Sequence, residues 1–152
     1  MSMTTDKVNS AAYRAMLGVE MYFTHCSIEK PLRELIKLRV SQINGCAYCI
    51  DMHWKDARAD GETEQRLYGL PAWRESPYYS ERERVCLQLA EELTRVADRC
   101  VSEEIHELAR EHFNSHELSD LAWIVAAINA WNRVNIALRT VPGDYQPPRA
   151  DR

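Results

Sequence analysis

The chain has 152 residues, of which 45% are hydrophobic and 28% charged, a composition typical of a globular domain that builds its own hydrophobic core. Its net charge of −4 gives no electrostatic reason to expect a nucleic-acid partner. The polar N-terminus lacks the apolar stretch of a secretion signal, and the most apolar run, residues 121–131, is too short to span a bilayer. We therefore expect one cytoplasmic domain over residues 1–152 with no membrane partner.

The spacing of apolar residues predicts an all-α protein of about six helices and no strand. The main helical segments are residues 10–24, 31–43, 46–60, 102–113 and 117–139, together with one that begins at residue 80, and a short one is expected at 62–68. The last segment is apolar on nearly all sides, so it should lie in the centre of the bundle or in a subunit interface. The proline-rich tail, residues 141–152, should be an extended arm or disordered beyond a core of about residues 10–140.

Local signals mark the ends of several of these helices. Pro31 is suited to the first position of a helix, and the pair Asn44-Gly45 should end that helix. Ser80 and Glu83 have the spacing of a capping box at the start of a later helix. Residues 69–78, which contain Gly69, Pro71 and Pro77, are expected to form a loop.

The five cysteines include one pair at motif spacing, Cys46 and Cys49. An odd number of cysteines without a secretion signal argues against a framework of structural disulfides. In a reducing compartment, a C-x-x-C pair points instead to thiol redox chemistry or to metal binding. The other three cysteines, Cys26, Cys86 and Cys100, have no partner at motif spacing and are interpreted as structural thiols.

A histidine and a carboxylate accompany this pair in the pattern E-x11-C-x-x-C-x3-H, formed by Glu34, Cys46, Cys49 and His53. The last three residues fall at positions i, i+3 and i+7, so a helix would place them on one face. Cys46 would lie at the helix N-terminus, where the helix dipole contributes only about 0.3–1 kcal/mol, which is less than one pKa unit. A proton acceptor is therefore still needed, and His53 can serve as one.

Two other interpretations of these residues remain open. Cys46, Cys49 and His53 could be three ligands of a zinc site, with a further histidine or Cys26 as the fourth. Glu34 falls opposite the main apolar stripe of its predicted helix, so by itself it is expected to be a solvated carboxylate. It could act as a base or in a proton relay only if the following helix covers the face of the helix on which Glu34 lies.

The stretch over residues 32–58, LRELIKLRVSQINGCAYCIDMHWKDAR, strongly resembles the alkyl hydroperoxidase D (AhpD)-like branch of the carboxymuconolactone decarboxylase superfamily. The segment INAWNR, residues 128–133, resembles a second recurrent stretch of that family. The resemblance implies an all-α fold that assembles into homo-oligomers, often trimers or hexamers. It also implies a thiol-dependent peroxidase that uses neither a cofactor nor a metal.

In the mechanism that the resemblance implies, Cys49 attacks a hydroperoxide and Cys46 then forms a disulfide with it. Glu34 and His53 form the proton relay, and an external dithiol reduces the disulfide. The helix dipole, by contrast, favours Cys46 as the more acidic thiol, and the sequence does not decide between the two cysteines. A decarboxylase-like lyase acting on a small organic acid is the alternative enzyme, since that branch shares the fold without relying on the cysteine pair.

One residue departs from the family pattern. The best-known peroxidase members have a second histidine between the cysteines, where this chain has Tyr48. A tyrosine, with a pKa of about 10, is a poor proton shuttle at neutral pH. The sequence therefore predicts either a weaker peroxidase or a different substrate.

Overall fold

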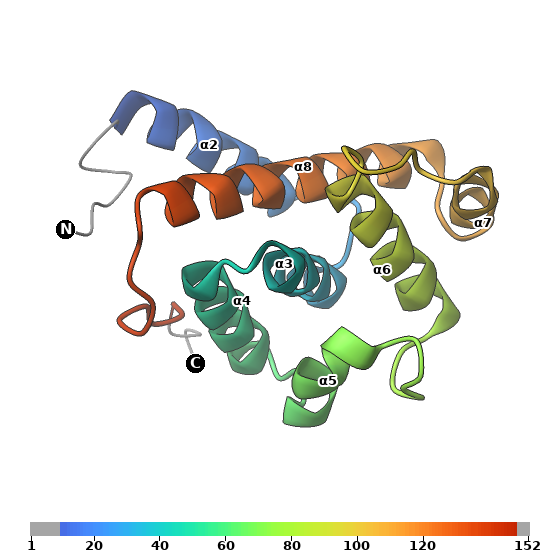
Figure 1. Ribbon diagram of the computed structural model, residues 1–152, viewed down its shortest axis with the longest axis horizontal. Helices are drawn as coiled ribbons and strands as arrows, with labels where there is room; N and C mark the ends of the chain where they lie inside the picture. The colour runs from blue at the N-terminus through green and yellow to red at the C-terminus, as the bar shows by residue number, and fades with distance from the viewer. Residues whose placement is uncertain (1–9, 149–152) are drawn as a thin grey trace.

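The computed structural model describes residues 10–148, and every regular element in that part of the chain is helical. Residues 1–9, for which no secretion signal is predicted, and the end of the tail, 149–152, lie outside the described residues. The seven α-helices and one 3-10 helix are α2 (Ser10–Phe23), α3 (Lys30–Asn44), α4 (Ala47–Ala59), α5 (Glu64–Gly69), η1 (Leu70–Ala72), α6 (Glu81–Thr94), α7 (Glu103–His112) and α8 (Ser115–Ala137) (Figure 1).

The predicted all-α class is confirmed, with seven α-helices in the described residues rather than about six. The seventh is the short α5, which agrees with the short helix expected at residues 62–68, and part of the predicted loop after it forms the single turn η1. Pro71 fits this turn because a proline is tolerated in the first turn of a helix. No helix among residues 10–148 is long and apolar enough to cross a membrane.

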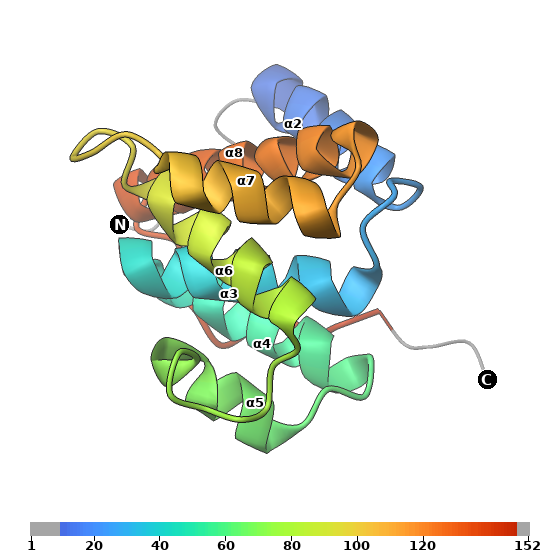
Figure 2. The same cartoon turned by 90° about the vertical axis from the view of Figure 1, so that its right-hand side faces the viewer.

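The long helix α8 runs through the middle of the molecule. In Figures 1 and 2 it lies between α2 on one side and the group of α3, α4 and α6 on the other, in agreement with its contacts to all four helices. Its inner residues Leu121, Ile124 and Ile128 are fully buried, whereas Trp123 and Ile136 are 59% and 48% exposed. The predicted long apolar helix is therefore central, with one apolar side left at the surface.

Helix α3 packs on nearly all of its sides, because it contributes to two hydrophobic clusters. Leu32, Ile36 and Val40 pack against α2, α6, α7 and α8, and Leu35 and Leu38 pack against α4, α5, η1 and α6. Each such side chain stabilises the fold by roughly 1.5–3 kcal/mol relative to an exposed one. This double packing also buries three polar residues of α3, Glu34, Lys37 and Ser41.

The local signals in the sequence end and begin the helices as expected. Pro31 lies in the first turn of α3, and Ser80 and Glu83 form the predicted capping box at α6. Gly45 ends α3 with a φ of 70°, in the left-handed region, and its N–H donates to the carbonyls of Ser41 and Gln42. Glycine adopts this conformation without the strain that a Cβ atom adds, so the chain reverses sharply between α3 and α4.

The chain after α8 forms an arm, residues 141–148, that returns alongside α4 (Figure 1). The Lys55 ammonium group of α4 donates to the carbonyls of Gly143 and Tyr145 at 2.9 and 3.0 Å, and the N–H of Gly143 donates to Asp51. The Tyr145 hydroxyl donates to Asp56 at 2.6 Å. In its described part the predicted extended arm is therefore held along one helix by several hydrogen bonds.

Candidate functional site

The turn at Gly45 folds α3 and α4 into an antiparallel pair. Near the open end of the pair, Lys30 of α3 forms an ion pair with Asp60 at 2.7 Å. One turn further along α3, Glu34 lies 2.8 Å from His53 of α4. These two contacts hold α4 against the face of α3 on which Glu34 lies. Glu34 could take part in a site only if that face is covered, so this condition is met.

Cys46 and Cys49 are joined by a disulfide at the closed end of this pair. Cys46 is the N-cap of α4, one residue before the helix begins, and its sulfur accepts a hydrogen bond from the backbone N–H of Cys49 at 3.3 Å. Both side chains are buried, with 1% exposed for each. The structure therefore brings the two predicted redox cysteines into direct contact.

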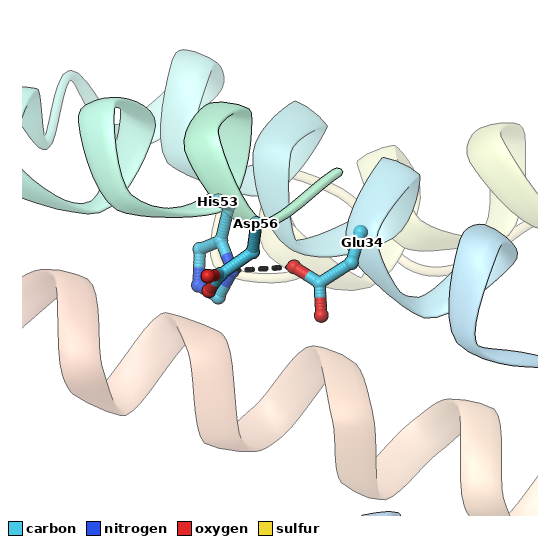
Figure 3. A group of neighbouring side chains, drawn as sticks. All are labelled: Glu34, His53 and Asp56. Atoms are coloured by element: carbon cyan, nitrogen blue, oxygen red, sulfur yellow. Dashed lines mark hydrogen bonds and ion pairs between the residues drawn. The ribbon is translucent and has the colours of Figure 1, made fainter. Parts of the chain in front are cut away.

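Glu34 and His53 form a buried hydrogen-bonded pair between the two helices (Figure 3). Glu34 is only 7% exposed and His53 only 5%. The expectation from the helical wheel alone, a solvated Glu34, is wrong, because α3 is covered on that side by α4. The two residues to which the family resemblance assigns a proton relay are therefore in direct contact.

The environment of Glu34 favours its ionised form. Burial by itself raises the pKa of this carboxyl, but the hydrogen bond with His53 and the nearby charges of His53 and Lys37 outweigh it, so the pKa is lowered from its usual value. An ionised carboxylate only accepts hydrogen bonds, so Nδ1 of His53 carries the hydrogen of this bond. The other ring nitrogen, Nε2, is then the position at which His53 can exchange a proton.

A second carboxylate, which the sequence analysis missed, lies beside this pair. Ligand atoms of Asp56, Glu34 and His53 all lie within 4.8 Å of one another, and Figure 3 shows Asp56 next to the His53 ring. Burial raises the pKa of Asp56, and the charge of Glu34 adds to this effect, although the hydrogen bond from Tyr145 opposes it. The spacing could have revealed Asp56, since it follows Cys49 and His53 at i+7 and i+3 on the same helical face.

A pocket of about 730 Å³ opens beside these residues, between α2, α3, α4, α8 and the C-terminal arm. This volume lies within the range of about 300–1,000 Å³ that is usual for sites of small organic molecules. Cys49, His53 and Glu34 line it, whereas Cys46 is not part of its wall. Much of the remaining wall is apolar or aromatic and includes Tyr13, Leu17, Phe23, Met52, Ile128 and Trp131.

Helix α8 also contributes a polar group to the site. Asn135 lines the pocket, and its Nδ2 lies 3.8 Å from the Cys49 sulfur and 3.0 Å from the carbonyl oxygen of Trp131. The only signal for it in the sequence is the repetition of asparagine every three residues, at 129, 132 and 135, along an otherwise apolar helix. Asn132 is buried and donates to Ser41, so it supports the packing of α8 on α3 rather than the pocket.

Tyr48, between the two cysteines, is half-buried and forms part of the pocket wall. The position that distinguishes this chain from the best-known peroxidase members therefore faces the same space as Cys49. A change of residue at this position alters the shape and polarity of the space available to a substrate.

The zinc interpretation of Cys46, Cys49 and His53 is not favoured by this geometry. The two sulfurs are bonded to each other rather than directed, together with His53, at a common point. Among the described residues, the group that could converge on a metal ion is instead Glu34, His53 and Asp56. In that group Nδ1 of His53 and Glu34 are already engaged with one another, which suits a proton relay.

Comparison with known proteins places these observations in a family. The sequence profile of the carboxymuconolactone decarboxylase family matches residues 9–92, which include both cysteines, Glu34 and His53. The uncharacterized protein YdfG of Bacillus subtilis is 47% identical over 125 residues, which are 82% of this chain and 85% of YdfG.

Two solved structures share the fold. One, from Agrobacterium tumefaciens, is a protein of unknown function suggested to be the antioxidant defence protein AhpD; it has a TM-score of 0.91 and 35% identity and covers 95% of this chain and 99% of its own. The other, the debrominase Bmp8 in complex with 2,3,4-tribromopyrrole, has a TM-score of 0.82 and 19% identity over 92% of this chain and 75% of its own. The likeness to Bmp8 concerns the fold alone and illustrates how varied the reactions on this fold are.

Proposed function

Because the chain belongs to the carboxymuconolactone decarboxylase family, in its AhpD-like branch, we propose that it is a thiol-dependent peroxidase and disulfide oxidoreductase. The observation that supports this best is the position of Cys49, which is bonded to Cys46 and lies in the wall of a large pocket beside the buried pair of His53 and Glu34. A cysteine pair that closes a disulfide next to a proton relay is what a two-thiol peroxidase requires.

In the oxidative half of the proposed reaction, the Cys49 thiolate attacks the terminal oxygen of a hydroperoxide. The O–O bond breaks, the alcohol leaves after taking up a proton, and Cys49 becomes a sulfenic acid. The Cys46 thiolate then attacks the Cys49 sulfur, so that an S–S bond forms and water is released. Cys49 has the first role because it lines the pocket and Cys46 does not.

In the reductive half, an external dithiol donates two electrons and two protons to the Cys46–Cys49 disulfide and becomes a disulfide itself. Over the whole cycle one hydroperoxide and one dithiol give one alcohol, one water and one oxidised reductant. The chemistry therefore needs no metal or organic cofactor.

His53 moves protons in this scheme, and Glu34 holds it in place. Glu34 accepts the Nδ1 hydrogen, which leaves Nε2 to take the proton of the Cys49 thiol and later to protonate the departing alkoxide. His53 and Cys49 are one helical turn apart on α4 and line the same pocket. The buried carboxylate also stabilises the positive charge that His53 acquires between these two steps.

Assembly into a homo-oligomer, a trimer or hexamer, is part of the proposal. Exposed apolar side chains on α2 and α8 support it, since Met21 is 70% and Trp123 59% exposed. Light scattering on the purified protein measures the number of copies directly. A monomer at micromolar concentration contradicts this part of the proposal and leaves the thiol chemistry unaffected.

The experiment that tests the function combines thiol titration with turnover. The fully reduced chain has five thiols. One equivalent of an organic hydroperoxide should oxidise two of them, so that three free thiols remain, those of Cys26, Cys86 and Cys100. Peptide mass spectrometry should locate the new disulfide between Cys46 and Cys49. With a dithiol present, the protein should consume the hydroperoxide catalytically.

The variants separate the roles of the thiols. Cys49→Ser should abolish turnover, and Cys46→Ser should stop after one oxidation, with a sulfenic acid on Cys49 that dimedone traps. Cys100→Ser is the matched control, because Cys100 is an exposed thiol outside the site, and it should keep full activity. Undiminished turnover in Cys49→Ser rejects the proposal, and conversion of a small organic acid by the double Cys46→Ser, Cys49→Ser variant would identify a lyase.

A further inference from the structure

The Cys49 sulfur has a hydrogen-bond donor that comes from a distant part of the chain. Asn135, near the C-terminal end of α8, places its Nδ2 at 3.8 Å from Cys49 Sγ, across 86 residues of sequence. The side chain of Asn135 is buried, with 8% exposed, and it lines the same pocket as Cys49. The donor and the sulfur thus meet in the wall of the pocket, on two side chains that are both buried.

The geometry fixes which end of the Asn135 amide faces the sulfur. The amide nitrogen also lies 3.0 Å from the carbonyl oxygen of Trp131, one turn earlier on α8. A carbonyl oxygen only accepts hydrogen bonds, so the group facing it must be the NH2 and not the amide oxygen. Of its two hydrogens, one is donated to Trp131, and the other is available to Cys49.

The two cysteines therefore receive different donors. The backbone N–H at the start of α4 donates to Cys46 at 3.3 Å, because Cys46 is the N-cap of that helix. The N–H group at the helix terminus therefore stabilises the sulfur of Cys46, the cysteine that closes the disulfide in the proposed reaction. Cys49, which lies inside the first turn, receives its donor from a side chain of another helix.

From these contacts we propose that Asn135 is the hydrogen-bond donor that stabilises the Cys49 thiolate for its attack on the peroxide. A hydrogen bond to a charged acceptor is stronger than one to a neutral acceptor, so the N–H group favours the thiolate over the thiol. Asn135 thereby offsets the advantage that the helix terminus gives to Cys46. This role rests on the proposed function of Cys49 as the attacking thiol.

The test measures the acidity of Cys49 directly. In a Cys46→Ser background, which keeps Cys49 reduced and leaves a good N-cap residue in place, the rate of Cys49 alkylation by iodoacetamide is followed against pH. Peptide mass spectrometry separates Cys49 from the three remaining cysteines. Asn135→Leu removes the donor at similar volume, and we expect the pKa of Cys49 to rise by about one unit. Asn135→Asp, which adds a negative charge, should raise it further.

Asn129→Leu is the matched control. Asn129 makes the same bond to a carbonyl one turn earlier on α8, that of Val125, and its other donor contact is to Thr94 rather than to a sulfur. This variant should leave the pKa of Cys49 unchanged, which separates the loss of the donor from a general disturbance of α8.

An unchanged pKa of Cys49 in Asn135→Leu overturns the proposal. If that variant does not fold, Asn135→Ala decides, because it removes the same donor without adding a charge, and an unchanged pKa of Cys49 there overturns the proposal as well. The alkylation assay contains no peroxide, so it judges Asn135 independently of turnover. A raised pKa in a protein without peroxidase activity keeps the role of Asn135 as thiolate donor and rejects the proposed function instead.

Discussion

Glu34 and His53 come from different helices and form a 2.8 Å hydrogen bond between two buried side chains. Neither residue is placed there by its own helix alone. The relationship depends on the turn at Gly45, which folds α4 back over the polar side of α3. Two measurable properties follow from it, one for the reaction and one for stability.

The first prediction concerns the proton relay. Glu34→Gln removes the charge that stabilises protonated His53 but keeps a side chain of the same shape. We expect kcat/KM for hydroperoxide to fall by about 100-fold, which is at the low end of the effect of a general acid or base. Steady-state kinetics against pH should show the loss throughout the active range. Glu64→Gln, at an exposed carboxylate paired with Arg58, is the control and should have wild-type activity.

The second prediction concerns stability against pH. The pKa of Glu34 is lowered in the folded state from its usual value of 4.5. Its contribution to stability is therefore complete above that usual value and is lost as the pH falls through the lower pKa of the folded state. Urea unfolding from pH 6 to pH 3 should show a steeper loss of stability in the wild type than in Glu34→Gln. Parallel curves for the two proteins would contradict this prediction.

The third prediction concerns Asp56, whose ionised carboxylate should destabilise the fold, whereas that of Glu34 stabilises it. Burial raises its pKa in the folded state from the usual value of 3.8, so its ionised form destabilises the fold at neutral pH. Asp56→Asn removes that charge and can still accept the hydrogen bond from Tyr145. The free energy of unfolding at pH 7 should rise, by less than about 1 kcal/mol. The gain should disappear below the usual pKa, where the wild-type carboxyl is protonated in both states.

The capping role of Cys46 gives a fourth prediction. Under reducing conditions, Cys46→Ser keeps a side chain that can accept the backbone N–H of Cys49, whereas Cys46→Ala does not. Cys46→Ala should therefore be less stable than Cys46→Ser by about 1 kcal/mol. Urea unfolding in the presence of a reductant measures the difference without a contribution from the disulfide. Equal stability of the two variants would show that the sulfur does not act as a cap.

Short-range patterns predicted much of the fold. The ends of α3 and the start of α6 follow from Pro31, Gly45 and Ser80, because each acts within one turn of the chain. The same reasoning placed Cys49 and His53 on one face of a helix. It failed at the turn η1, where Gly69 and Pro71 were interpreted as a loop, although both residues adopt conformations that a short helical turn accommodates.

The rest of the site depends on packing between helices, which periodicity does not show. Glu34 was expected in solvent on the evidence of its own helix, and only the family pattern connected it with the cysteines and His53. Asn135 and Tyr145 lie far from the cysteines in the sequence, so no local spacing connects them to the motif. The helical spacing does align Asp56 with Cys49 and His53, but an aspartate at that position could equally be a surface carboxylate, so the sequence did not single it out.

The pocket is built from both ends of the described chain. Tyr13 and Leu17 of α2 form one part of its wall, and Thr140, Tyr145 and Pro148 form another. On a ribosome that adds about 5–20 residues per second, roughly 5–20 s pass between the synthesis of the cysteines and that of the arm. During that interval the nascent chain carries the redox motif without an enclosed site. The proposed peroxide chemistry therefore depends on residues that are synthesised last: a chain released before α8 has the two cysteines, Glu34 and His53, but lacks Asn135 and the part of the pocket wall that α8 and the arm supply.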